Sequence, residues 1–196
     1  MYHCFSHSIV QQIQQPKLSW NDYFTGTVSP TITPGQYSST QTPTSSNVYI
    51  FGCFFINCTS SSGGGAVYCS STAKYVLVES TTFLTCRSNG DGGAIASYNT
   101  ENVFNRVCGN DCCTLGASYG QFTHKDTSGS ATSKNYINYS SIVRCVNQVS
   151  SSYETLRHCS GKLLYSSNNI SMNKCYYRPG IVCSPYKDSN SFTGSL

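Results

Sequence analysis

The most constraining feature of this sequence is a pair of similar segments, FINCTSSSGGGAV starting at Phe55 and FLTCRSNGDGGAI starting at Phe83. An aromatic residue, a cysteine, a glycine and an alanine recur in both segments with the same spacing of 28 residues. The matching positions are Phe55 and Phe83, Cys58 and Cys86, Gly64 and Gly92, and Ala66 and Ala94. A shared offset across otherwise different sequence indicates an internal repeat, and repeats of this length are typical of solenoids.

Looser copies follow the two clear ones. They are NRVCGNDCC, whose Cys112 lies 26 positions after Cys86; NYSSIVRC, which ends on Cys145; NNISMNKC, which ends on Cys175, 30 positions later; and GIVCS at 180–184, which resembles AVYCS at 66–70. About five copies are therefore present, two of them well preserved.

The repeat unit consists of short strand-like runs, such as YVLVESTTFLTC and NYINYSSIVRC, in which apolar and polar residues nearly alternate before a Gly, Asn or Ser break. Amphipathic helices, which helical repeats require, are not visible. Several short strands in about 28 residues fit one turn, or rung, of a β-solenoid in which rungs lie ~4.8 Å apart. The sequence thus predicts an all-β fold, a right-handed parallel β-helix of about five rungs.

This fold assigns a position to each repeated residue. Glycine supplies the backbone conformations that corners require, so the glycine pairs form corners between strands. We expect Val67 and Ile95 to point inward at the start of the next strand, and the phenylalanines and cysteines to form interior columns. The predicted structural residues are Phe55, Cys58, Gly64, Gly65, Ala66, Val67, Phe83, Cys86, Gly92, Gly93, Ala94, Ile95, Cys145 and Cys175. A phosphate-binding loop is disfavoured because SSSGGGAVYC lacks a following Gly-Lys-Ser/Thr.

Three regions are predicted along the chain. Residues 1–47 hold four of the six prolines and no repeat, and we interpret them as an N-terminal cap and extended lead-in. Residues 48–184 form the repeats, with an irregular rung or insertion at 114–135. Residues 185–196 form a tail or a truncated rung.

Composition narrows the class of partner. Charged residues make up 10% of the chain, the net charge is +4, and no basic run appears, so we expect no nucleic-acid partner. No apolar stretch reaches the ~18 residues of a membrane-spanning helix or resembles a signal peptide. Asn57, Asn138 and Asn169 begin N-glycosylation triplets that apply if the chain is secreted.

Catalytic and metal-binding patterns are weak. No two of the eight acidic residues lie within three positions of one another, although Glu101 and Asp126 could meet through loop folding. A zinc site of CGNDCC with His124 or His158 would lack the second cysteine pair that such sites usually have. We predict no catalytic residue, no metal and no cofactor. The cysteines are left as disulfides (Cys108–Cys112 or Cys69–Cys113) or as a column of buried thiols.

Tyrosine is abundant, and two interpretations compete. Fifteen tyrosines could present an exposed stacking surface for sugars or a protein, or could simply fill polar-tipped strand positions, the interpretation we favour. The candidates for an exposed surface are Tyr49, Tyr68, Tyr75, Tyr98, Tyr119, Tyr136 and Tyr139.

The elements FFIN at 54–57, GGAV at 64–67 and GGAI at 92–95 resemble the repeat of polymorphic outer-membrane proteins, known from chlamydial adhesins. The cysteine in place of asparagine, and RVCGNDC, look more like the similar surface proteins of trichomonad protists. The resemblance covers residues 48–113 well and residues 114–196 weakly. It implies a right-handed parallel β-helix at a cell surface, although this chain shows neither a membrane anchor nor an autotransporter barrel.

The function expected from repeat and resemblance together is a non-enzymatic surface or secreted module for adhesion to cells, glycans or proteins. The main alternative is a polysaccharide-processing β-helix, because many parallel β-helices are lyases or hydrolases. That alternative requires a cleft with at least two carboxylates and a basic residue. A third hypothesis is that the chain is a fragment of a larger surface protein.

Overall fold

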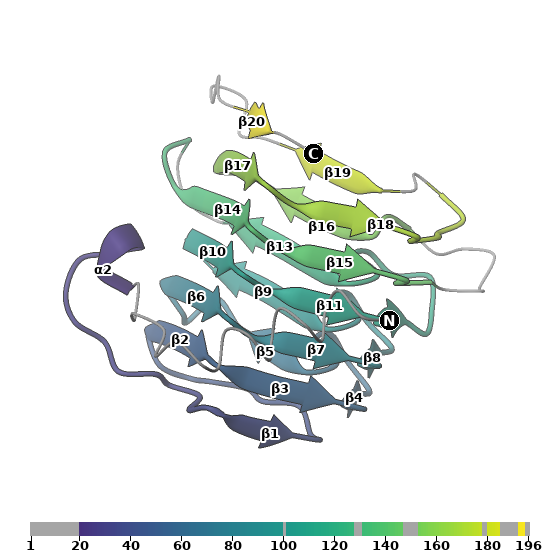
Figure 1. Cartoon of the computed structure of the whole chain (residues 1–196), viewed down its shortest axis with the longest axis horizontal. Coiled ribbons are helices and arrows are strands. Elements are labelled where there is room, and N and C mark those ends of the chain that lie inside the picture. Colours follow the sequence, from purple (N-terminus) through teal and green to yellow (C-terminus); the bar gives the residue numbers. More distant parts are fainter. Residues whose placement is uncertain are drawn as a thin grey trace.

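The computed structural model describes residues 20–99, 101–127, 131–146, 153–177, 180–184 and 192–194. Parallel strands stack rung upon rung into a β-helix, and one short helix, α2 (Trp20–Tyr23), lies beside it (Figure 1). The all-β parallel β-helix predicted from the repeat is confirmed. Within the described residues no helix is long and apolar enough to span a membrane.

Four sheets run along the coil. Sheet A contains β2 (Asn47–Phe51), β6 (Tyr75–Glu79), β10 (Glu101–Asn105), β14 (Lys134–Asn138), β17 (Lys162–Ser166) and β20 (Phe192–Gly194). Sheet B contains β1 (Gly35–Tyr37), β3 (Cys53–Ile56), β7 (Thr82–Leu84), β11 (Cys108–Asn110), β15 (Ser141–Val143) and β18 (Asn169–Ser171). Sheet C contains β5 (Val67–Cys69), β9 (Ile95–Asn99), β13 (Thr123–Thr127), β16 (Leu156–Cys159) and β19 (Ile181–Ser184). The short sheet D contains β4 (Thr59–Ser60), β8 (Arg87–Ser88) and β12 (Cys113–Thr114).

The register reproduces the sequence repeat where the two clear copies lie. Asn47 pairs with Tyr75, and Phe55 pairs with Phe83, each 28 residues apart. Val67 pairs with Ile95 at the same offset. The match of GIVCS to AVYCS is also confirmed, because Ile181 continues the column of Val67 through sheet C.

Residues 114–135 do not form an insertion in the part of the chain that the structure describes. They contain β13, which pairs residue for residue with β9 on one side and with β16 on the other. Extra length instead follows this strand in the chain, since β10 and β14 pair at an offset of 33 residues, from Asn102 to Asn135.

The predicted match of Cys145 to Cys175 is wrong. The Cys145 backbone N–H donates to Asn173 Oδ1 at 2.8 Å, and Val146 bridges to Lys174. The offset here is therefore 28 residues, and Asn173 occupies the next place in the cysteine column. Cys175 is buried two positions further on, with its sulfur 3.9 Å from Thr155 Oγ1.

The interior contains the predicted columns of like side chains. The Phe55 and Phe83 rings stack with centroids 5.0 Å apart and planes within 3°. In the next rung Gly109 takes the phenylalanine position, and the Phe122 ring fills the space above it, 5.8 Å from the Phe83 ring. One aromatic ring thus replaces another from the opposite wall of the coil.

The repeated glycines form corners, as predicted. Gly64 and Gly92 have φ of +63° and +70°, and a Cβ on either would overlap a backbone carbonyl three residues ahead. Their N–H groups donate to Asp91 and Tyr119 carbonyls in the next rung, both at 2.9 Å. Glycine is needed there because the backbone is left-handed and tightly packed.

The cysteine column is a ladder of buried free thiols formed by Cys58, Cys86, Cys112 and Cys145, all fully buried. Successive thiols are hydrogen-bonded from Cys58 to Cys145. Hydrogen bonds to the next thiol and burial raise the pKa of Cys58 and Cys86, and burial raises the pKa of Cys112. These thiols are neutral and therefore poor nucleophiles.

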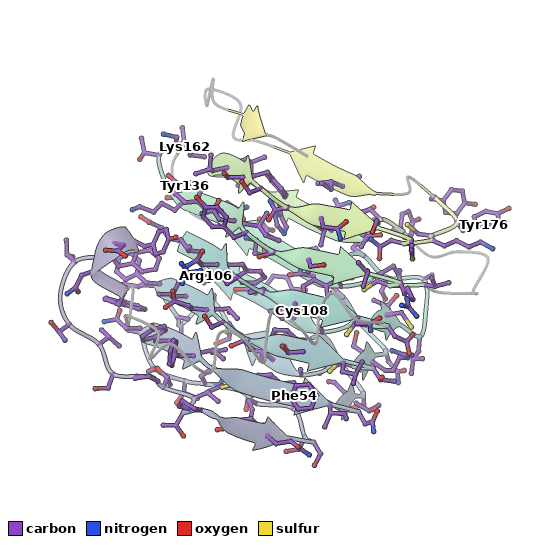
Figure 2. The ribbon with its side chains drawn as sticks, viewed as in Figure 1. Phe54, Arg106, Cys108, Tyr136, Lys162 and Tyr176 are labelled. Carbon is purple, nitrogen blue, oxygen red and sulfur yellow. The ribbon has the colours of Figure 1, made fainter. Side chains whose placement is uncertain are left out.

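Neither of the predicted disulfides forms. Cys69, Cys112 and Cys113 are free. Cys108 is disulfide-bonded, but its partner is none of the nine cysteines found free. Cys108 lies on the outer side of sheet B in register with Phe54 two rungs earlier (Figure 2).

The described part of the N-terminal region, 20–47, covers both an edge and a side of the coil. Strand β1 pairs with β3 and continues sheet B beyond the first rung. Helix α2 packs on the outer face of sheet A, where Trp20 and Phe24 lie against Tyr49 and Tyr75. The region from residue 185 onward was predicted as a tail or truncated rung, and only β20 within it is described.

Candidate functional site: the outer face of sheet C

The outer face of sheet C gathers most of the chemistry-bearing side chains that the fold exposes. In β9 and β13 the odd-numbered positions point into the coil, so Tyr98, His124 and Asp126 point outward. The corners that precede each strand add Asp91 and Tyr119. We call this set the tyrosine face, and its members are Tyr68, Asp91, Tyr98, Tyr119, His124, Asp126, Tyr153, Glu154, Arg157 and Tyr177.

Aromatic rings form a continuous row along this face. Ring centroids are 5.9 Å apart for Tyr68 and Tyr98, 5.3 Å for Tyr98 and His124, and 6.2 Å for His124 and Tyr119. The row continues from Tyr119 to Tyr153 at 4.7 Å and from Tyr153 to Tyr177 at 5.5 Å. Each step approximates the spacing between rungs, so the row follows the axis of the coil.

Asp91 holds the middle of the row in place. Its Oδ1 accepts the Tyr119 backbone N–H at 2.9 Å, and its Oδ2 accepts the Tyr98 hydroxyl at 3.2 Å. Burial and the nearby Asp91 carboxylate raise the pKa of Tyr98, so its hydroxyl stays protonated. The two tyrosines are therefore oriented by one carboxylate.

Arg157 and Glu154 form a second fixed pair. Arg157 Nη1 donates to Glu154 Oε1 at 3.0 Å, and the guanidinium carbon lies 4.0 Å from the Tyr119 ring centroid. The Glu154 side chain is fully buried, and its Oε2 has no hydrogen-bond partner among the described residues. A buried carboxylate is stable here because it faces a stacked guanidinium.

His124 lies between the Tyr98 and Tyr119 rings and is only 7% exposed. Burial lowers its pKa, against the opposing effect of Asp91, so the ring is neutral at pH 7. Its Nδ1 is 3.6 Å from Asp91 Oδ2, too far for a hydrogen bond, and has no partner among the described residues. One buried nitrogen on this face is thus unsatisfied.

Asp126 is the exposed carboxylate of the face. It lies in register with Tyr98 and Cys159 on the neighbouring strands. No hydrogen bond or ion pair joins it to another of the described residues. Glu101, which could have met Asp126 through loop folding, instead lies in sheet A and pairs with Lys134 at 3.0 Å.

A separate polar cluster lies inside the coil at the same level. Lys125 is fully buried, donates to the Tyr136 carbonyl at 3.0 Å and lies 4.3 Å from the Phe104 ring centroid. His158 is the next residue in its column, and its Nδ1 contacts the Tyr165 hydroxyl. Burial and Lys125 lower the pKa of His158 well below its usual value.

The tyrosine face is suited to binding rather than to acid–base catalysis. Exposed rings offer stacking surfaces and the charged groups offer hydrogen bonds, which together recognise sugars and polar chains. Asp91 and Glu154 are both occupied by partners within the protein. Two shallow hollows, of about 420 and 380 Å³, are lined by residues 31–45 and 21–27 and include no member of the face.

Sequence reasoning identified only part of this face. Tyr68, Tyr98 and Tyr119 lie on it, but Tyr49 is fully buried beneath Trp20, Tyr75 and Tyr136 pack near α2, and Tyr139 is exposed at the end of β14. His124, Tyr153, Arg157 and Tyr177 were not identified as part of such a surface. Aligning Asp91 with Tyr119 through the corner glycines at 92 and 120 would have shown them as neighbours.

The remaining predicted positions divide clearly. The residues of the zinc hypothesis diverge, since Cys112 and His158 are interior, Cys108 is disulfide-bonded and His124 is on the outer face. The described residues contain no group of three suitable ligands. Of the glycosylation candidates, Asn57 and Asn169 are exposed, whereas Asn138 is 6% exposed and leaves no room for a glycan in the folded chain.

Comparison with known proteins gave no match: no family model, no curated protein and no solved structure is detectably similar to this chain.

Proposed function

We propose that this β-helix is a non-enzymatic adhesion module, acting at a cell surface or outside the cell, and that it binds glycans through the tyrosine face. The observation that supports this most is the continuous row of rings from Tyr68 to Tyr177 with polar groups alongside. Aromatic rings stack on the apolar faces of sugar rings, while carboxylate and guanidinium groups bond their hydroxyls.

The extracellular setting has independent support. Disulfides persist in oxidising compartments, and Cys108 on the outer side of β11 is disulfide-bonded. Two of the three glycosylation triplets have exposed asparagines. The repeat also resembles that of adhesin surface proteins.

A glycan array tests the proposal. The wild-type chain should bind at least one class of glycan, and Tyr98→Ala and Arg157→Ala should each weaken that binding about tenfold or more. Tyr139→Ala is the matched control, because that tyrosine is 59% exposed but lies at the end of a sheet A strand. Equal binding by all four proteins, or no binding at all, would contradict a glycan site at this face.

Polysaccharide cleavage is the second candidate, favoured by the two carboxylates and the basic residue that meet around Tyr119. Incubation of array-positive glycans with the protein, followed by mass analysis of the products, separates the two functions. Shortened products that disappear in Asp91→Asn would establish an enzyme. Intact glycan after long incubation supports a binding module.

A further inference from the structure

The charges on the tyrosine face specify the class of glycan more narrowly. Three carboxylates, Asp91, Asp126 and Glu154, face one guanidinium, Arg157. The fifth titratable group, His124, is neutral because burial lowers its pKa. The face is therefore locally negative, although the whole chain carries a net charge of +4.

The excess negative charge is concentrated at one exposed group. Arg157 compensates Glu154, and the Tyr98 hydroxyl and Tyr119 N–H stabilise Asp91. Asp126 remains exposed beside the Tyr98 ring, without an ion-pair partner in the described chain. A cation above that ring would be attracted by both the carboxylate and the ring's negative face.

An uncompensated polar atom points to a ligand at the same place independently of charge. His124 Nδ1 is buried and unsatisfied between the Tyr98 and Tyr119 rings, and an unsatisfied buried nitrogen is destabilising unless something bonds it. A neutral imidazole nitrogen accepts a hydroxyl or amine proton, or donates to an oxygen, according to its tautomer. A hydroxyl- or amine-bearing ligand lying on the row would satisfy it.

The row also matches a linear chain. Its rings are 4.7 to 6.2 Å apart, close to the ~5 Å length of one pyranose unit, so consecutive sugars could meet consecutive rings. We propose, on the basis of the glycan-binding function above, that the preferred ligand is a linear glycan with free amino groups. An amine lies at Asp126 and Tyr98, and acidic glycans are repelled.

Three oligosaccharides of equal length test this by calorimetry at low salt: a glucosamine pentamer, its N-acetylated form and a galacturonate pentamer. The amine should bind about fivefold more tightly than the acetylated chain, and the uronate most weakly. Asp126→Asn should abolish the fivefold difference while leaving the acetylated chain's affinity unchanged. Asp22→Asn, an exposed carboxylate on α2, is the matched control and should change nothing.

The outcomes separate this inference from the function beneath it. If the acetylated or uronate chain binds as well as the amine, or Asp126→Asn leaves the ratio intact, the amine preference is wrong while glycan binding stands. If none of the three chains binds but a lysine-rich peptide does, both are overturned, and the face is a peptide-binding surface.

Discussion

His158 shows how a single buried group makes the stability of the fold depend on pH. The folded state disfavours the charged ring because burial and Lys125 lower its pKa, whereas in the unfolded chain it titrates near 6.5. Below about pH 6.5 the unfolded state therefore takes up a proton that the folded state refuses. The free energy of unfolding should fall by about 1.4 kcal/mol for each pH unit below that point.

Urea unfolding at pH 7.5, 6.5 and 5.5 measures this slope. His158→Gln should remove most of the contribution, and His124→Gln a smaller share, because its pKa is also lowered but Asp91 opposes the shift. Should His158→Gln not fold, the ring resonances of His158 in the wild type should stay unshifted across this range. A titration of that ring near pH 6.5 would show the interpretation to be wrong.

Gly109 and Phe122 provide a second test at the level of residues. A Cβ on Gly109 would overlap the Phe122 ring, so Gly109→Ala should destabilise the chain by about 1–3 kcal/mol. Phe122→Ala alone should cost about 3–5 kcal/mol through the cavity it leaves. The double variant should cost at least about 1 kcal/mol less than the sum, because the alanine methyl then enters that cavity. Strict additivity in a urea double-mutant cycle would refute the contact.

At the scale of elements, the corners determine how one strand leads to the next. Gly92→Ala should destabilise the fold by at least about 2 kcal/mol, since a left-handed backbone and an overlap with the Ile95 carbonyl act together. Gly116→Ala is the control, because its added methyl would meet only the Asn89 carbonyl at 3.4 Å. Thermal melts of both variants give the comparison, and equal melting temperatures would argue against a special corner.

Strand β13 illustrates what a repeat in sequence does not reveal at this scale. Residues 120–123 read GQFT where the clear copies read GGAV and GGAI, so the third copy was taken for an irregular rung or insertion. The backbone nevertheless pairs residue for residue with β9. Parallel pairing depends on backbone hydrogen bonds, and only Gly120, with φ of +68°, had to be retained at the corner.

At the scale of the whole molecule, the thiol ladder reports whether the coil opens. Cys58, Cys86, Cys112 and Cys145 are fully buried, so an alkylating reagent at neutral pH should leave all four unmodified in the native chain. Cys159, which is partly exposed, should react first and serves as the internal control. Peptide mass analysis locates the modified sites, and all four should react in urea. Native labelling of Cys86 or Cys112 would mean that rungs separate without global unfolding.

The sequence by itself determined the class of fold, the 28-residue period, the corner glycines, the Phe55–Phe83 stack and the start of the cysteine column. It could do so because rungs of equal length place like residues above like, and the repeat then appears directly in the spacing. Only the tertiary structure decided which residue follows Cys145, where the third rung lies, and which tyrosines share a face. Links of unequal length change the offset from rung to rung, and partners such as Trp20 bury one tyrosine while another with similar sequence context stays open. The candidate site belongs to this second group, because Asp91, Tyr98, His124 and Arg157 become neighbours only when four rungs are stacked in register.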